Sequence, residues 1–404
     1  MKQYFENIAW YDYLIFLVYF GIFSYLLYRI GDTFFNIGKK ALNVIILIFG
    51  FYFLLIIGDS FFNFLPFLPD TELYSYMIST GQYPDTSSEN ILALYYLTLF
   101  IGTICLNNPV IFVIFCIFLY LLSLMIFVKT WKKVYPAFSP DAELIFAILA
   151  FVWPAAMIYI TAPLREAFIL FGFAMFFSGF LNFIFYKKWK SLIIGTILIC
   201  AIRLQLIVFA FPVLGALIVW KLNIRNVFKI AIAFITILIA FLAVRYILVE
   251  KPITPETMAQ MRNVNISRAG SLGYGNVEWT SYLDMVKDYP FIIAQFLFSP
   301  LPIFVQHDPI STFIPFLDLL FMISLMIVVF IRSKHHWQIQ RPVILLMLFF
   351  IILFGAYEYH ITGAVRHRMP ILILLMLMAS PTISKWFIKK KTNEKIEHIA
   401  VDNK

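Results

Sequence analysis

Long apolar segments recur along almost the whole chain, and polar residues are concentrated in the short stretches between them. A helix of about 20 apolar residues spans the hydrocarbon core of a bilayer, and many of these segments approach that length. They lack the strict alternation of a transmembrane barrel strand. Because the bilayer offers the backbone no water to bond with, helices are the expected solution. The sequence therefore predicts an all-α, polytopic transmembrane helical bundle.

Short clusters of Lys and Arg separate the apolar segments, as expected of cytoplasmic loops under the positive-inside rule. Six clusters stand out, at Arg29/Lys39/Lys40, Lys129/Lys132/Lys133, Lys187/Lys188/Lys190, Lys221/Arg225/Lys229, Arg332/Lys334/Arg341 and the tail from Lys385 to Lys404. If all six lie inside, the chain must cross the membrane an even number of times between neighbouring clusters. We therefore expect the N-terminus outside and the C-terminus inside, in a multi-pass protein of the cytoplasmic membrane.

This constraint predicts about eleven spans. They lie at 12–29, 41–58, 110–128, 143–162, 167–186, 191–202, 204–220, 230–248, 314–331, 342–357 and 371–387. Two further apolar pieces, 91–105 and 291–305, would break the parity, so we expect them to be interfacial or re-entrant helices on the outer face. One alternative stays open, in which 191–220 forms a single long tilted helix with a buried Arg203. With no internal repeat, the chain is interpreted as one transmembrane domain, 1–388, followed by a basic cytoplasmic tail, 389–404.

Composition agrees with membrane insertion and excludes several other classes. Hydrophobic residues make up 62% of the chain and charged residues 13%, with a mean hydropathy of +0.88, which a soluble surface does not tolerate. The net charge of +9 does not indicate a nucleic-acid partner, because the basic residues lie in the loop clusters. The first apolar segment lacks a basic leader and a small-residue cleavage site, so it is expected to be a retained span. The three cysteines show no CxxC spacing, so they suggest neither a metal site nor a disulfide framework.

The predicted topology gathers the less common polar residues at the outer face. The first outer loop carries Asp59, Asp70 and Glu72 without any Lys or Arg. The other polar residues predicted on this side are Arg165, Glu166, Arg203, Arg262, Arg268, Glu358, His360, Arg366, His367 and Arg368. Ionisable side chains at membrane depth are costly and commonly line a cavity or a pathway. Several arginines that face an acidic loop indicate a binding site for an anion.

Arginine presents a planar fork of donors that suits phosphate. At the outer leaflet, the phosphate that combines a lipid tail with a polar head is the diphosphate of a polyprenyl-linked saccharide. Transfer of a sugar from this donor needs a carboxylate base and cationic groups for the leaving diphosphate. We expect Asp70 as the base, with Glu72 and Asp59 as alternatives. The expected substrate-binding residues are Arg165, Glu166, Arg203, Arg262, Arg268, His360, Arg366 and Arg368. The outer acids would also suit a divalent cation, although no spacing requires one.

Four segments resemble bacterial polysaccharide polymerases of the O-antigen/exopolysaccharide type and the wider group of GT-C-type membrane glycosyltransferases. They are PDTELYSY (69–76), LREAFILFGFAMFF (164–177), MRNVNISRAGSLGYG (261–275) and GAVRHRMPILILL (363–375). The resemblance implies that an outer-loop acid acts as base and that arginines hold the lipid diphosphate. The chain lacks the paired-acid signature of many GT-C enzymes, which leaves the choice among Asp70, Asp59 and Glu72 open.

Each candidate residue also has a purely structural interpretation. Asp70 resembles a helix N-cap with acidic residues in the following turn. Arg165 and Glu166 resemble an ion pair at a helix start, Arg203 could extend to the interface, and Arg366 and Arg368 could anchor the last span at the head groups. Two other functions compete with an enzyme, namely a transporter or flippase of a lipid-linked saccharide, and a membrane subunit without chemistry. The lack of inverted repeats disfavours a transporter.

Overall fold

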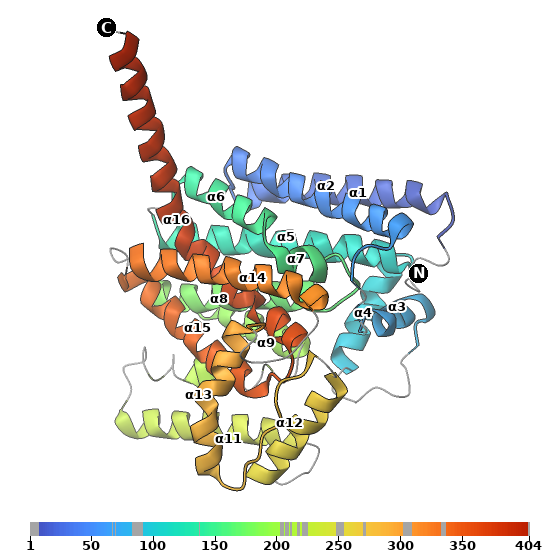
Figure 1. Cartoon of the computed structure of the whole chain (residues 1–404), viewed down its shortest axis with the longest axis vertical. Helices are drawn as coiled ribbons and strands as arrows, with labels where there is room; N and C mark the ends of the chain where they lie inside the picture. The colour runs from blue at the N-terminus through green and yellow to red at the C-terminus, as the bar shows by residue number, and fades with distance from the viewer. Residues whose placement is uncertain are drawn as a thin grey trace.

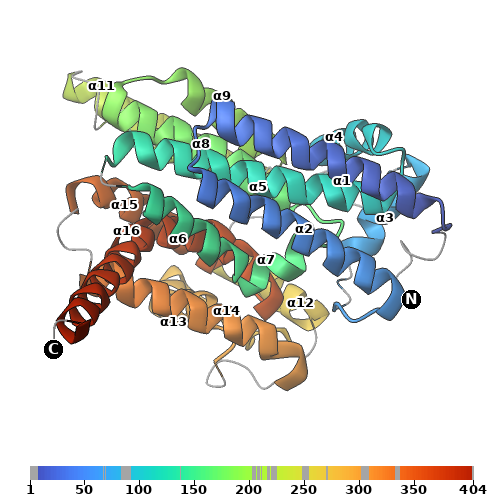
Figure 2. The ribbon, with the colours of Figure 1, turned by 90° about the horizontal axis from the view of Figure 1, so that it is seen from above.

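The computed structural model describes residues 8–66, 68, 70–82, 92–136, 138–202, 206, 210, 212–215, 219, 225–247, 254–269, 272–301, 309–332 and 337–402. Within these ranges the chain is helical and has no β-strand; the one extended pairing is an isolated bridge between Gly273 and His360. The all-α prediction is therefore confirmed. Figures 1 and 2 show a bundle in which several long helices run side by side while shorter ones lie across or beside them.

Six helical stretches in the described part of the chain are long and apolar enough to cross a membrane. They are Asp12–Phe34, Lys39–Phe62, Pro109–Val134, Glu166–Tyr186, Thr312–Ile331 and Ile361–Phe387. Three shorter apolar stretches accompany them, at Lys190–Ile202, Asn226–Thr236 and Ile339–Gly355. Each of the six includes or closely overlaps a predicted span, but the expected total of about eleven is not confirmed. Most of the predicted span 204–220 lies outside the described residues.

Helix α5 (Pro109–Val134) is the buried centre of the bundle. It begins where the Asn108 side chain accepts a hydrogen bond from the Val110 amide at 2.9 Å, with Pro109 in the first turn, where a missing N–H costs nothing. It packs against α1 (Asp12–Arg29), α2 (Lys39–Phe62) and α8 (Glu166–Tyr186) (Figure 2). At about 1.5 Å of rise per residue, a helix of this length is about 39 Å long, enough to separate two chemically different ends.

One end of α5 carries the predicted cytoplasmic residues. Lys132 forms an ion pair at 2.6 Å with the buried Glu143 of α6 (Pro140–Phe151), and the Gly38 amide donates to the same carboxylate at 2.7 Å. Lys133 donates to Asn182, near the C-terminal end of α8, at 2.6 Å. Three predicted basic regions thus meet at one end of the bundle, whereas Glu166, the first residue of α8, lies at the other.

Helices α8 and α9 (Lys190–Ile202) pack closely together, and two glycines permit it. A side chain on Gly179 would overlap the backbone at Leu192, and one on Gly195 would overlap the backbone at Phe176. This reciprocal use of small residues is typical of helices that associate within membranes.

The predicted span 143–162 is not a single helix, which corrects the sequence interpretation. Helix α6 ends at Phe151, and α7 (Pro154–Tyr159) begins after a break in which Trp153 is extended, with ψ 112°. The residue before a proline is disfavoured in the α conformation, so Pro154 explains the break. The buried Trp153 indole donates to Asp318 of α14 (Pro309–Ile327) at 2.9 Å. This hydrogen bond holds the break against a helix that lies far away in the sequence.

The C-terminal segment differs from the prediction in a similar way. Helix α15 (Trp337–Tyr357) is followed by a turn at 358–360 and by α16 (Ile361–Asp402), which continues through the predicted tail 389–404 as far as Asp402 (Figure 1). The stretch 361–370, expected to be a loop before a span at 371–387, is therefore helical. Arg366, His367 and Arg368 consequently lie on successive faces of one helix instead of in a flexible connection.

Four further helices lie around the end of the bundle opposite the lysines. Helices α3 (Asp70–Thr80) and α4 (Leu92–Ile104) contact each other and α5. Helix α12 (Pro255–Ala269) occupies the middle of what was expected to be a long loop, and α13 (Tyr282–Phe298) begins with a capping box between Ser281 and Asp284. The helical expectation holds for 91–105. For 291–305 the boundaries are wrong, because α13 starts nine residues earlier and ends before Ser299. Helix α11 (Asn226–Ile247) and two short π-helical turns, η2 (Ile30–Phe34) and η6 (Val328–Arg332), complete the described elements.

Candidate functional site

An arginine joins two carboxylates at the end of the bundle opposite the lysines. Arg366 of α16 donates from Nη1 to Asp70 Oδ2 at 2.8 Å and from Nε to Glu166 Oε1 at 2.7 Å. Its Nη2 lies 2.5 Å from the same Glu166 oxygen. The three residues come from α3, α8 and α16, so the pairing fixes three distant parts of the chain at one point. The alternative structural interpretation, an ion pair between Arg165 and Glu166, is not what the structure shows, because Glu166 pairs with Arg366.

The two carboxylates differ in their access to solvent. The Glu166 side chain is 3% exposed and the Arg366 side chain 14%, whereas that of Asp70 is 47% exposed. Partial burial acts to raise the pKa of Asp70, but the charge and the hydrogen bond of Arg366 outweigh it and hold that pKa below its ordinary value. Asp70 is therefore an ionised, accessible carboxylate, and Glu166 is the buried partner that anchors the arginine.

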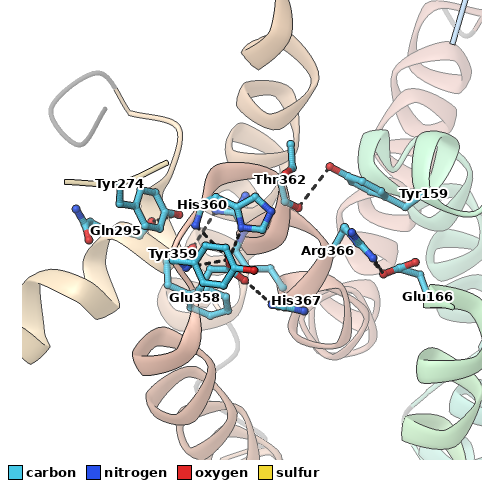
Figure 3. Close-up of polar contacts among 12 residues, drawn as sticks. Tyr159, Glu166, Tyr274, Gln295, Glu358, Tyr359, His360, Thr362, Arg366 and His367 are labelled. Atoms are coloured by element: carbon cyan, nitrogen blue, oxygen red, sulfur yellow. Dashed lines mark hydrogen bonds and ion pairs between the residues drawn. The ribbon is translucent and has the colours of Figure 1, made fainter. Parts of the chain in front are cut away.

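A second cluster surrounds the carboxylate of Glu358, which is 1% exposed. Its Oε1 accepts from His360 Nδ1 at 2.9 Å and its Oε2 contacts His367 Nδ1. Figure 3 shows both histidines around Glu358, with Arg366 and Glu166 beside them. Burial acts to raise the pKa of Glu358, but the charge of His367 and the hydrogen bonds from both imidazoles lower it well below its ordinary value.

Local backbone structure builds this second cluster. A side chain on Gly363 would overlap both the Glu358 carboxylate and the His360 ring, so only glycine lets the first turn of α16 pack so closely. The Tyr274 amide donates to the Tyr359 carbonyl at 3.0 Å, which pairs the segment after α12 with the turn at 358–360. The buried Arg262 of α12 donates to the Glu358 carbonyl at 2.6 Å.

Arg368 is fully buried and bonded within the protein. Its Nη1 donates to the carbonyl oxygens of Leu297 at 2.7 Å and Ser299 at 2.9 Å, near the end of α13. Its Nη2 lies 3.5 Å from Asp318 Oδ2 in α14, where both side chains are 0% exposed. The residue expected to clamp a phosphate thus holds α13 and α14 against α16.

A narrow crevice with a free volume of only about 10 Å³ adjoins the site between α8, α15 and α16. Its polar lining consists of Glu166, Arg366 and His367, and its apolar lining of Ile169, Leu170, Phe350, Phe354, Met369 and Pro370. The rings of Phe350 and Phe354 are stacked with centroids 4.3 Å apart, and Phe354 lies 5.1 Å from the His367 ring. The lining therefore changes from charged to aromatic and aliphatic within a single space.

Asp59, Glu72 and Arg268 do not join this site, whereas Arg165 lies beside it. The buried Asp59 accepts a hydrogen bond from the Leu65 amide at 2.7 Å, and Glu72 is exposed on α3. Arg268 is exposed in the last turn of α12. Arg165, at the N-cap of α8, is close enough for its charge to act on Asp70, and Arg203 lies outside the described residues.

Glu358 and His367 belong to the site although neither was among the predicted catalytic or binding residues. The signal was present in the sequence, since YEYH and RHR lie within one short segment, but a single sequence does not show which side chains meet. Among the described residues, no group of three or more His, Cys, Asp or Glu side chains has the arrangement of a metal site.

Comparison with known proteins gives no relative from which a role could be transferred. No family model, no curated protein and no solved structure matches the chain.

Proposed function

We propose that the chain is a membrane glycosyltransferase or polysaccharide polymerase that takes its sugar from a polyprenyl-diphosphate-linked donor at the outer face of the cytoplasmic membrane. One observation carries the proposal, namely that Arg366 lines a narrow amphipathic crevice and also binds the accessible carboxylate of Asp70. The apolar lining of the crevice comes from helices apolar enough to lie within a bilayer, and its polar lining includes Arg366 and His367. A ligand with a lipid chain and an anionic head would meet apolar helix surface and charged side chains next to each other at this end of the bundle.

Asp70 is the proposed base. The acceptor hydroxyl oxygen attacks the anomeric carbon of the donor sugar, and the bond from that carbon to the diphosphate oxygen breaks with its electron pair leaving on the diphosphate. The hydroxyl proton passes to Asp70. The ion pair with Arg366 keeps Asp70 ionised and fixes its orientation. Because the same ion pair lowers the pKa of Asp70, the proton passes to it only once the attacking hydroxyl has become acidic in the transition state.

Arg366 is proposed as a positioning residue for Asp70 as well as one wall of the crevice. Two carboxylates already bind its guanidinium, so its charge is balanced before any phosphate arrives. Arg165, the other nearby guanidinium, is the arginine proposed to approach the diphosphate.

The proposed topology keeps the lysine-rich end in the cytosol, with the N-terminus outside and the C-terminus inside. Helices α3, α4, α12 and α13 would then form the outer, interfacial part that surrounds the acceptor. Their position at the end away from Lys132 and Lys133 supports this orientation.

Glycan analysis of a deletion strain tests the proposal. Complementation with Asp70→Asn should give no surface glycan and should let the lipid-linked donor accumulate at the outer leaflet, at normal protein levels. Asp32→Asn, which changes an exposed carboxylate in η2 near the lysine-rich end, is the matched control and should restore the glycan. Normal glycan from Asp70→Asn would refute the role of Asp70. Donor trapped in the inner leaflet of the deletion strain would instead indicate a transporter.

A further inference from the structure

A groove lies along α12, at the end of the bundle opposite the lysines. Its free volume is about 640 Å³, within the range of about 300 to 1,000 Å³ that is usual for ligand pockets. Glu256, Gln260 and Ser267 line it from α12, and Glu278, Trp279 and Thr280 line it from the segment that leads into α13. Because Glu256 lies in the first turn of α12 and Ser267 in the last, this α12 groove follows the whole helix.

Hydrogen bonds between its two walls hold the α12 groove in shape. Asn263 of α12 donates from Nδ2 to the Val277 carbonyl at 2.8 Å and accepts from the Val277 amide at 2.9 Å. The Trp279 indole donates to Asp288 of α13 at 2.9 Å. Ala259 and Trp279 are buried in a small apolar cluster with α13 and form the floor. The groove is therefore already formed in the free protein, which lowers the cost of ordering on binding.

The rim of the α12 groove carries hydrogen-bonding groups that the fold does not use. Glu256, Gln260 and Glu278 are exposed, and within the described part of the chain none of them forms a side-chain hydrogen bond or an ion pair. The Ser267 hydroxyl donates to a carbonyl of its own helix, so its oxygen can still accept. Carboxylates accept charge-assisted hydrogen bonds, and an amide both donates and accepts. This rim suits a ligand that carries many hydroxyl groups.

Charge distinguishes the α12 groove from the site around Asp70. The residues that line it include two carboxylates, Glu256 and Glu278, and no Lys or Arg. Like charges repel, so the groove disfavours a diphosphate or an acidic sugar. A saccharide without acidic groups offers hydroxyl donors to both carboxylates and meets no such repulsion.

The α12 groove is connected to the site around Asp70 but does not reach the reacting groups. Arg262 donates to the Glu358 carbonyl at 2.6 Å, and Gln260 lies about 160° away from Arg262 around the helix. After α12, Gly273 pairs with His360, whose charge acts on Asp70. The helix itself therefore separates the groove from the turn at 358–360. A ligand that serves both places must be longer than one sugar.

We propose that the α12 groove binds the acceptor as an oligosaccharide without acidic groups, through sugars remote from the hydroxyl that reacts. The inference rests on the proposed function and narrows it, because an acceptor of this length is what a polysaccharide polymerase extends. Glu256 and Glu278 accept hydrogen bonds from sugar hydroxyls, and Gln260 binds through its amide. These residues hold the acceptor while the proton passes to Asp70, and no bond forms or breaks in the groove.

Binding of a released saccharide to the purified full-length chain in detergent tests the proposal. Donor and acceptor of a polymerase carry the same repeat unit, so the probe is the oligosaccharide released by mild acid from the lipid-linked saccharide that accumulates in the Asp70→Asn strain. Calorimetric titration should show binding to the wild type. Glu256→Gln and Glu278→Gln should each lower the affinity about 10-fold, because each removes a charge-assisted hydrogen bond. Asp32→Asn, which changes an exposed carboxylate outside the groove, is the matched control and should bind as the wild type does.

A blocking variant separates binding from folding. Gln260→Trp places a large side chain at an exposed helix position that lines the groove, so it should abolish saccharide binding with an unchanged thermal unfolding midpoint. In the deletion strain, Gln260→Trp should restore a glycan of reduced chain length, whereas Asp70→Asn should restore none. If Gln260→Trp does not fold, the two Glu→Gln variants still decide the question.

The outcomes distinguish the two proposals. If the accumulated saccharide does not bind the wild type, or binds all groove variants with equal affinity, the role of the α12 groove is refuted and the proposed function stands. Binding in the groove of a saccharide that contains acidic sugars would refute the stated selectivity. If the Asp70→Asn strain accumulates no lipid-linked saccharide, the proposed function is refuted and the acceptor groove with it.

Discussion

The bond between Arg366 and Glu166 should contribute far more to stability than the bond between Arg366 and Asp70. Both carboxylates contact one guanidinium, so the comparison holds the cation constant. Glu166 is 3% exposed and meets two nitrogens of Arg366, whereas Asp70 is 47% exposed and meets one. Removing one partner of a buried pair leaves an uncompensated charge and costs about 3 to 5 kcal/mol, whereas exposed pairs contribute about 0.2 to 1 kcal/mol.

Two double-mutant cycles measure the difference. One cycle combines Arg366→Gln with Glu166→Gln, and the other combines Arg366→Gln with Asp70→Asn. We expect Arg366→Gln alone to destabilise the chain by about 3 kcal/mol or more. The coupling energy should be about 1 to 3 kcal/mol for Glu166 and below about 1 kcal/mol for Asp70. Equilibrium unfolding in mixed micelles gives both values from the same set of variants.

A particular result would refute the reasoning. Equal coupling energies in the two cycles, or a larger one for Asp70, would mean that burial does not determine the strength of these bonds. The assignment of Glu166 as anchor and Asp70 as the available carboxylate would then be wrong. Full stability of Arg366→Gln would show that α3, α8 and α16 are held together without this contact.

Three further predictions concern other features. The pKa of Asp70 in the folded chain lies below its ordinary value of 3.8, so its ionised form stabilises the fold above about pH 4. This contribution is lost as the pH falls through the folded pKa. The unfolding free energies of wild type and Asp70→Asn should therefore differ at neutral pH and converge in acid. Gly363→Ala should lower the unfolding free energy by about 1 to 3 kcal/mol because the Glu358 carboxylate and the His360 ring must move, while Gly21→Ala, where nothing lies within 4 Å, carries no such cost. Gly179→Ala should lower the unfolding free energy by about 1 to 3 kcal/mol because α8 and α9 must separate, whereas Gly21→Ala is neutral or slightly stabilising.

Hydropathy alone located most of the long helices, and the reason is physical. An apolar segment of sufficient length has one stable solution in a bilayer, so α2, α5 and α8 follow from the sequence with end errors of a few residues. The break at Trp153 was missed although Pro154 signals it, because an apolar proline does not interrupt a hydropathy pattern. Residues 361–370 were interpreted as a loop for the opposite reason, since their charges hide a helix that buries them against other helices.

The sequence predicted in part which residues share one end of the bundle, but not which carboxylate pairs with which arginine. Positive clusters predicted that Asp70, Glu166 and Arg366 belong to the same end of the bundle, and the structure brings these three together. Which carboxylate meets which arginine depends on helix rotation and tilt, and these are set by packing that no single sequence reveals. Arg262 was expected to bind a substrate phosphate, yet it bonds to a backbone carbonyl in the protein.

The segment RHR (366–368) shows why residue type alone does not predict the role of each side chain. Successive residues of a helix point about 100° apart, so three neighbours reach three different environments. Arg366 faces α3 and α8, where it joins Asp70 and Glu166, and Arg368 faces the end of α13 and is fully buried. His367 contacts the Glu358 carboxylate and, like Arg366, lines the crevice. A cluster that resembles a single phosphate clamp in the sequence therefore has three separate roles in the fold. One arginine orients a carboxylate, the other holds two helices, and the histidine between them contacts the buried Glu358.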